Sequence, residues 1–443
     1  MTLALTNATL LDGTENMTAQ EGMCVLVEDG KISGISKMGE VELPAGCEVV
    51  DLGGKYLMPG LINMHVHLCG DGKPHSSDGA EKLVKLALSL AVGRAYLRAT
   101  LKKSLQTQLA SGVTTVRSVG DPGYADIAVR NIINSGKCEG PRLIASGCGI
   151  SVPGGHARLF AKMATTEEEA RAYVREHAEK GADQIKLFIT GGVFDAEVEG
   201  EPGVLRMSQK IATAICDEAS KLGLLTSAHV ESPEGVEVAL KAGVDTIEHG
   251  SVLSEELVSL FKENGLHKSS SLTCTISPAL PFACFDPEIT HSTHIQKVNG
   301  RIVYEGVVEA ARTALKSDIP VGLGTDSACP FVTHYDMWRE VVYFQKHTGV
   351  SNAFALYTAT LKNAELLRVA DETGSVEVGK SADLIVTSKN PLDDLMALGE
   401  VNQVFMRGKL VKTCKVNHLP ELDKELDTIW DDLEKDSFVS EWK

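Results

Sequence analysis

The chain contains 443 residues, of which 43% are hydrophobic, and its formal net charge is −17 at pH 7. This acidic balance argues against binding to nucleic acid or to an anionic membrane. It says little about a small-molecule substrate, which is the partner that we expect, because a local pocket can carry either sign of charge. Because the 10 cysteines form no CxxC pair and no export signal or membrane-spanning apolar run is visible, we expect a cytoplasmic protein with reduced thiols.

Both ends of the chain have the pattern of short β-strands. Near the N-terminus, Asp29-Gly30 separates two β-rich runs, which is a strong hairpin signal. Strands are expected at residues 3–5, 23–27, 31–35, 49–52, 383–387 and 404–411. The N-terminal segment alone is too short to bury a good core. We therefore predict one small composite β-sandwich domain built from residues 1–58 and 375–415.

The intervening residues 59–374 alternate between strands and helices, which is typical of an α/β fold with a parallel sheet. Strands are expected at residues 61–67, 112–117, 142–145, 184–189, 224–229, 245–249, 268–272 and 320–326. Helices are expected at residues 81–110, 126–135, 166–180, 208–222, 233–242, 254–264 and 304–317. Eight strands, each followed by a helix or a long loop, predict a (β/α)8 TIM-type barrel.

The tail, residues 416–443, is acidic and has a different pattern. Apolar residues recur at helical spacing within residues 421–437, which predicts an amphipathic helix. Such a helix would pack on the body of the protein or on another subunit. The alternative is a solvated, frayed chain end.

A histidine pair ends the first strand of the predicted barrel. Side chains of a strand alternate between its two faces, so His65 and His67 point to the same side. Two imidazoles on one face at the end of an apolar strand suit a metal ion. Taken alone, the pair could equally be ordinary core or surface histidines, so the metal hypothesis needs further ligands.

Such ligands follow at the ends of other strands, which meet at one mouth in a barrel. They are Lys186 on the fourth strand, His229 on the fifth, His249 on the sixth and Asp326 on the eighth. A lysine inside an apolar strand is costly unless it is paired or loses its charge. Lys186 therefore forms a salt bridge within the barrel or reacts with carbon dioxide to give a carbamate that bridges two metal ions. The donor set suits a two-metal hydrolytic site.

These segments resemble the amidohydrolase superfamily. The resemblance lies in residues 58–67, 112–117, 185–187, 228–229, 247–250, 324–327 and 374–384. It is strongest to the branch that holds prolidase-like dipeptidases, Xaa-Pro and Xaa-Arg/Lys carboxypeptidases and imidazolonepropionase-related hydrolases. The resemblance implies a homo-oligomer and two divalent ions, for which zinc is the best choice although manganese, iron or cobalt would also fit.

The resemblance also implies residue roles. His65, His67 and Asp326 would hold the more buried ion, and His229 and His249 the second, with carboxylated Lys186 bridging both. A hydroxide between the ions would attack an amide carbonyl, and Asp326 would pass its proton to the leaving nitrogen.

Two further residues concern the substrate. His156 would stabilise the carbonyl oxygen or bind a substrate carboxylate, or it only structures its loop. Related enzymes that remove a C-terminal amino acid often have Tyr two residues after the fifth-strand histidine, where this chain has Glu231. If Glu231 faces the pocket it would repel a carboxylate and favour a cation or a hydrogen-bond donor; otherwise it faces solvent.

We therefore expect a metal-dependent hydrolase that cleaves the C–N bond of a small molecule such as a dipeptide or an N-acyl amino acid. The alternative is hydrolysis of a cyclic amide, as imidazolonepropionases do. A deaminase is disfavoured because Ser232 stands where such enzymes have Glu, and because Lys186 would have no role there. A non-catalytic binding protein is disfavoured because binding alone needs no general base.

Overall fold

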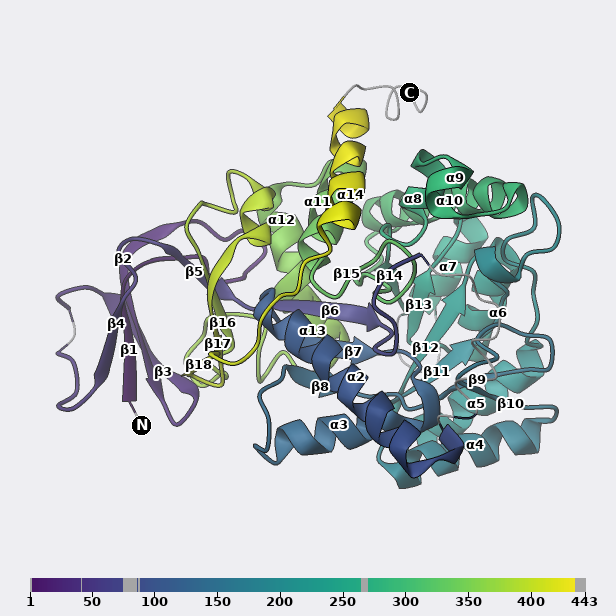
Figure 1. The fold of residues 1–443 in the computed structure, drawn as a ribbon, viewed down its shortest axis with the longest axis horizontal. Helices are drawn as coiled ribbons and strands as arrows, with labels where there is room; N and C mark the ends of the chain where they lie inside the picture. The colour runs from purple at the N-terminus through teal and green to yellow at the C-terminus, as the bar shows by residue number, and fades with distance from the viewer. Residues whose placement is uncertain (1, 41, 75–85, 87, 264–269, 435–443) are drawn as a thin grey trace.

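The computed structural model describes residues 2–40, 42–74, 86, 88–263 and 270–434, and it divides into a β-sheet and a barrel (Figure 1). Strands from both ends of the chain share the sheet, as predicted. They are β1 (Thr2–Leu10), β2 (Gln20–Glu28), β3 (Lys31–Lys37), β4 (Glu48–Asp51), β5 (Tyr56–Pro59), β16 (Leu384–Thr387), β17 (Val401–Met406) and β18 (Lys409–Leu410). Their order is β18-β17-β16-β5-β1-β2-β3, with β4 paired to β1.

Local chemistry accounts for the turns of this sheet. The Asp29-Gly30 turn joins β2 and β3 in the predicted antiparallel hairpin, and Gly30 takes a positive φ of 84° that costs a glycine little. Strand β16 pairs antiparallel with β5, which joins the C-terminal strands to the N-terminal ones. Leu5, Val25 and Phe405 are among the side chains that form a separate small core here.

The barrel strands are parallel and most are followed by a helix that covers the outside. The strands are β6 (Leu61–Val66), β7 (Val113–Ser118), β8 (Arg142–Ile144), β9 (Gly149–Ser151), β10 (Ala161–Met163), β11 (Gln184–Phe188), β12 (Leu225–Val230), β13 (Thr246–His249), β14 (Ser271–Cys274) and β15 (Val321–Leu323). The covering helices include α2 (Ala91–Ala110), α3 (Ala125–Asn134), α4 (Glu167–Lys180), α5 (Gln209–Lys221), α6 (Pro233–Ala242), α7 (Glu255–Glu263) and α10 (His294–Lys316).

Backbone hydrogen bonds join the two barrel sheets, β6-β7-β8 and β10-β9-β11-β12-β13-β14-β15, at both seams. After β15, the amide of Asp326 donates to the carbonyl of His65 at 2.8 Å, and the amide of His67 donates to Ser327 at 3.0 Å. At the other seam, the amide of Asp183 donates to Ala145 at 2.8 Å. The predicted barrel fold is therefore confirmed.

Helix α4 begins and ends where the sequence predicted. The Thr166 hydroxyl caps it by accepting from the amide of Glu169, three glutamates occupy the first turn, and Gly181 ends it in the left-handed region. The third expected strand, at residues 142–145, is β8, but the short strands β9 and β10 that follow it were not predicted. The helix expected at residues 304–317 starts ten residues earlier, because Thr293 and Gln296 form a capping box.

Some predictions fall partly or wholly outside the described residues: the first part of the helix at 81–110, residues 268–269 of the seventh strand, and the end of the tail helix. Within the described part of the chain, no helix is both long and apolar enough to cross a membrane. The exact limits of the domains stay a prediction.

The tail helix is α14 (Pro420–Glu434), and it packs on α11 (Met337–Thr348) (Figure 1). The Trp430 ring lies 4.9 Å from that of Tyr343, centroid to centroid, and the guanidinium of Arg339 binds Asp427 at 2.7 Å. Leu426 and Ile429 are buried in this contact. The alternative of a solvated end is therefore wrong for residues 420–430.

We expect Leu426→Ala to lower the free energy of unfolding by about 2–4 kcal/mol, because a buried leucine side chain would leave a cavity between α14 and the barrel. Thermal and denaturant unfolding followed by circular dichroism would measure the change. Lys424→Ala, at an exposed position of the same helix, is the control. An equal effect of both substitutions would show that the apolar face of α14 does not stabilise the protein.

Candidate functional site

A cavity of about 360 Å³ lies at the carboxyl ends of the barrel strands. All eight predicted site residues line it: His65, His67, His156, Lys186, His229, Glu231, His249 and Asp326. They come from strands or loops that are far apart in sequence and that meet because the strands are parallel. The sequence analysis therefore selected residues that the fold brings together.

The first cluster consists of His65, His67 and Asp326. The Nε2 atoms of His65 and His67 lie 3.3 and 3.4 Å from Oδ1 of Asp326. The other ring nitrogen of each histidine is already engaged, since Nδ1 of His65 bonds Glu248 at 2.6 Å and Nδ1 of His67 bonds the carbonyl of Gly120 at 2.8 Å. These bonds aim both Nε2 atoms at Asp326, whose buried Oδ1 has no hydrogen-bond partner in the described part of the structure.

The second cluster contains His229, Glu231 and His249, each of which offers one donor atom within 4.8 Å of the others. Nδ1 of His249 bonds the hydroxyl of Thr275 at 2.7 Å, and Nε2 of His229 bonds the carbonyl of Gly191 at 3.0 Å. One nitrogen of each ring is left for a ligand. The sequence analysis did not include Glu231 in this group, and the structure places it there.

The protonation states of three histidines and of Asp326 suit metal binding, which needs neutral imidazoles and an ionised carboxylate. Burial lowers the pKa of His67 to about 4 and holds the pKa values of His229 and His249 well below the usual range. Burial alone would raise the pKa of Asp326, but the imidazoles of His65 and His67 hold it well below its usual range. Asp326 and His249 also have positive φ angles of 58° and 66°, an uncommon backbone conformation often found at functional sites.

Lys186 lines the same cavity as both clusters. Its side chain is 1% exposed, and Nζ has no hydrogen-bond partner among the described residues. Nζ lies 5.3 Å from the centroid of the Phe188 ring. Burial lowers the pKa of Lys186 to about 8. No described carboxylate forms an ion pair with this amine, so the salt-bridge alternative lacks a partner, and the unpaired amine fits the carbamate alternative.

Arg117 and Glu248 are functional residues that the sequence analysis missed. Glu248 accepts from the guanidinium of Arg117 at 2.7 Å through Oε1 and bonds His65 through Oε2. Burial would raise the pKa of Glu248, but Arg117 and His65 hold it well below its usual range. The pair therefore fixes the orientation of the His65 ring. Arg117 and Glu248 could have been identified from the sequence, because each is a charged residue inside a strand that was expected to be buried. The same pattern identified Lys186.

His156 and Glu231 form the polar side of the cavity. His156 stacks on His229 with centroids 4.3 Å apart, and its Nδ1 bonds Asp195, which the sequence analysis also missed. Oε2 of Glu231 is buried and has no hydrogen-bond partner among the described residues, so this oxygen does not face solvent. Burial and the nearby carboxylates of Asp326 and Asp195 raise its pKa well above the usual range. Gly192 makes room here, since a Cβ would lie 3.3 Å from His156 and 3.4 Å from Glu231.

Three other side chains of a type that could bind metal or substrate, Cys69, His294 and His75, can be compared with this set. Cys69 lines the cavity, and burial raises the pKa of its thiol, so no reactive thiolate is available. His294 begins α10 and pairs with Glu199 at 3.3 Å, away from the cavity lining. His75 lies outside the described residues.

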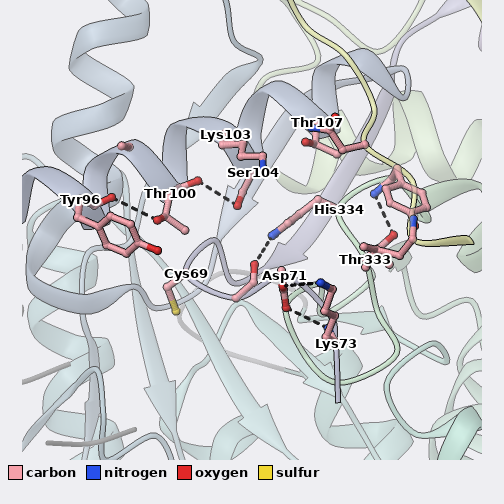
Figure 2. Close-up of a pocket in the computed structure, with 15 residues that line it drawn as sticks. Cys69, Asp71, Lys73, Tyr96, Thr100, Lys103, Ser104, Thr107, Thr333 and His334 are labelled. Atoms are coloured by element: carbon pink, nitrogen blue, oxygen red, sulfur yellow. Dashed lines mark hydrogen bonds and ion pairs between the residues drawn. The ribbon is translucent and has the colours of Figure 1, made fainter. Parts of the chain in front are cut away.

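A second hollow of about 670 Å³ lies beside the first one, between α2 and the loop after β15 (Figure 2). Cys69 and Gly70 line both cavities. The backbone carbonyl of Gly70 accepts a hydrogen bond from Nε2 of His334 at 2.8 Å. Lys73 and Lys103 also line the second hollow, but no described histidine cluster does. The side chains that could bind metal ions are therefore concentrated in the smaller cavity.

A hydrolytic (β/α)8 barrel is the class of protein that this fold and site define. Comparison with known proteins agrees, because the Amidohydrolase family model matches residues 56–411. The chain belongs to the amidohydrolase family. It is an enzyme that acts on C–N bonds.

Individual relatives support this conclusion. The crystal structure of a "putative prolidase" from Bifidobacterium longum is 39% identical, has a TM-score of 0.86 and covers 97% of this chain and 99% of its own. A Xaa-Pro dipeptidase, solved with methionine in its active site, is 29% identical with a TM-score of 0.80, and covers 93% of this chain and 100% of its own. Ochratoxinase from Aspergillus niger is 28% identical over 386 residues, which are 80% of this chain and 75% of its own.

Proposed function

We propose that the protein hydrolyses the amide bond of a dipeptide or an N-acyl amino acid at a centre of two divalent ions. The observation that carries the proposal is the pair of donor clusters with the unpaired amine of Lys186 in the same cavity. Burying polar groups without hydrogen-bond partners costs free energy unless a bound ligand interacts with them. Metal ions and a carbamate would satisfy all of them together.

In this proposal the metal ligands are the three members of the first cluster and the two histidines of the second, while Glu231 is left for the substrate. His65, His67 and Asp326 would hold one ion, His229 and His249 the other, and Lys186, carboxylated by carbon dioxide, would bridge them. Zinc suits this donor set. When bound, the ions would activate a water molecule and polarise the scissile carbonyl.

The remaining chemistry belongs to side chains of the chain. Asp326 stays ionised at neutral pH and can take a proton and hand it to the leaving nitrogen. His156, held by Asp195 at Nδ1, would present Nε2 to a substrate oxygen. Arg117 and Glu248 keep the His65 ring in place during turnover.

The charge of the cavity favours particular substrates. Lys186 is the only lysine or arginine in the described lining, and the carboxyl group of Glu231 faces the cavity without a partner. A free substrate carboxylate would find little to bind except His156. We infer that Glu231 binds a cationic group or a hydrogen-bond donor of the substrate. A positive charge at this position would favour the ionised form of the Glu231 carboxyl group.

We expect Glu231→Gln to raise KM about tenfold for a dipeptide with a free amino group, and to change KM little for its N-acetylated counterpart, because only the ammonium gains from a carboxylate. Steady-state kinetics on the matched pair would show it. Glu234→Gln, exposed on α6, is the control. If KM rose equally for both substrates, Glu231 would not bind the amino group of the substrate.

Hydrolysis of a cyclic amide is the alternative with the same residues. It would add one water to a single product, whereas cleavage of a dipeptide gives two products, and mass spectrometry distinguishes them. Deamination is further disfavoured because the hydroxyl of Ser232 caps α6 by accepting from the amide of Gly235.

Metal content tests the proposed centre directly. Protein purified without chelator and with bicarbonate should contain about two ions per chain. His65→Ala and His229→Ala should each lower this number, since each removes one ligand from a different cluster. About one ion per chain in the unmodified protein would contradict the two-metal centre and would direct the substrate screen toward cyclic amides.

A further inference from the structure

Two phenylalanines, Phe194 and Phe282, line the cavity that holds the histidine clusters. Phe194 belongs to the short helix η2 (Val193–Asp195), and Phe282 belongs to α8 (Leu280–Cys284). Their rings meet edge to face, with centroids 5.4 Å apart and an interplanar angle of 83°. Phe282 is buried, whereas Phe194 is 48% exposed. An aromatic ring that lines a cavity and stays half exposed has apolar surface available for a ligand.

The loop that carries Phe194 is held at several points. Thr190 and Leu205 form an antiparallel bridge at its base, and the amide of Gly191 donates to the carbonyl of Val204 at 2.9 Å. Farther out, the buried amide side chain of Asn299 accepts from the amide of Gly200 at 2.8 Å and donates to the carbonyl of Val198 at 2.9 Å. Phe194 is therefore presented by a pinned loop, which lowers the entropy lost when a ligand binds it.

The short helix η2 carries a polar contact and an apolar contact at neighbouring residues. Asp195 binds His156 on the polar side of the cavity, while its neighbour Phe194 contacts Phe282 on the apolar side. The cavity lining also contains further apolar residues, among them Val193, Pro278, Ala279 and Val303. A substrate that reaches the donor clusters would therefore place a polar group near His156 and an apolar group near the two rings.

We propose that Phe194 and Phe282 form a subsite for a bulky apolar side chain of the substrate, with an aromatic ring as the best occupant. This proposal rests on the proposed amide hydrolysis and adds a substrate class to it: amino-acid amides that carry a large apolar side chain. A third ring can pack on the exposed part of Phe194, because edge-to-face and offset contacts extend beyond a pair.

Kinetics on two N-acetyl amino acids would test the subsite. N-acetylphenylalanine and N-acetylalanine share every group except the ring, so the ratio of their kcat/KM values reports only the side chain. We expect the native enzyme to prefer the phenylalanine derivative, and Phe194→Ala to lower this ratio about tenfold. Phe194→Leu should give an intermediate ratio. Val198→Ala, exposed on the same loop outside the described cavity lining, should leave the ratio unchanged.

Binding separates a failure of the subsite from a failure of the proposed function. Calorimetry with the same two compounds on Asp326→Asn protein measures affinity without turnover. A tenfold smaller affinity ratio in the Phe194→Ala, Asp326→Asn double variant supports the subsite even if neither compound is hydrolysed, an outcome that would count against the proposed substrate. Equal ratios with and without Phe194, in kinetics or in binding, would overturn the subsite.

Discussion

Replacing Asp326 with Asn should lower kcat by at least about a thousandfold while the bound metal content stays near that of the native enzyme. Asparagine keeps the shape and one oxygen of the side chain, so the first cluster retains a donor beside His65 and His67. It cannot accept a proton, however, and so cannot transfer one to the leaving nitrogen. Stopped assays of product formation, together with metal analysis of the same samples, would show the two effects separately.

Asp427→Asn is the matched control, because Asp427 lies on α14 and binds Arg339 at the protein surface. It should keep native kcat. If Asp326→Asn protein kept native kcat as well, Asp326 would not be the general base. If it lost all metal, the loss of turnover would report ligation by Asp326 instead of proton transfer.

Replacing Lys186 with Met should have opposite effects on activity and on the stability of the metal-free protein. Turnover should fall to background, because Met cannot form the bridging carbamate. The free energy of unfolding of the metal-free protein should rise by about 1–3 kcal/mol, because an apolar side chain of similar length replaces a buried amine without a partner. Assays and denaturant unfolding of chelator-treated protein would measure both, and Lys241→Met, at an exposed lysine, controls for the lost charge.

The stability gain depends on pH in a defined direction. The pKa of Lys186 is about 8 in the folded protein and 10.5 in its ordinary state, so the unfolded chain binds the proton more tightly. The cost of folding around Lys186 is therefore fully present below pH 8 and shrinks as the pH rises toward 10.5. The advantage of Met should shrink over the same interval. An advantage that grew with pH would show that the folded protein stabilises the charged amine.

The carbamate itself has a readout that does not depend on activity. Metal-loaded native protein equilibrated with ¹³C-bicarbonate should give a carbamate carbon signal that Lys186→Met protein lacks. The same signal in both proteins would assign the carbamate to another amine.

Local patterns predicted most elements well. The Asp29-Gly30 hairpin and the capped start of α4 depend on residues within a few positions of one another, so their sequence carries the whole signal. The start of α10 was missed because an apolar spacing marked only its second half, whereas the capping box at Thr293 determines where it begins. The short strands β9 and β10 were missed because three-residue strands depend on pairing with their neighbours, which local sequence does not encode.

The sequence by itself determined the alternation of strands and helices and, through the strand ends, which side chains would meet at one mouth. Parallel strands place their carboxyl ends together, so six distant ligand candidates could be chosen without coordinates. Only the tertiary structure decided that Glu248 and Arg117 orient His65, that Nζ of Lys186 has no hydrogen-bond partner among the described residues, and that Phe194 contacts Phe282. These relations join residues as far as 183 positions apart, and they depend on side-chain direction and burial, which no local spacing encodes.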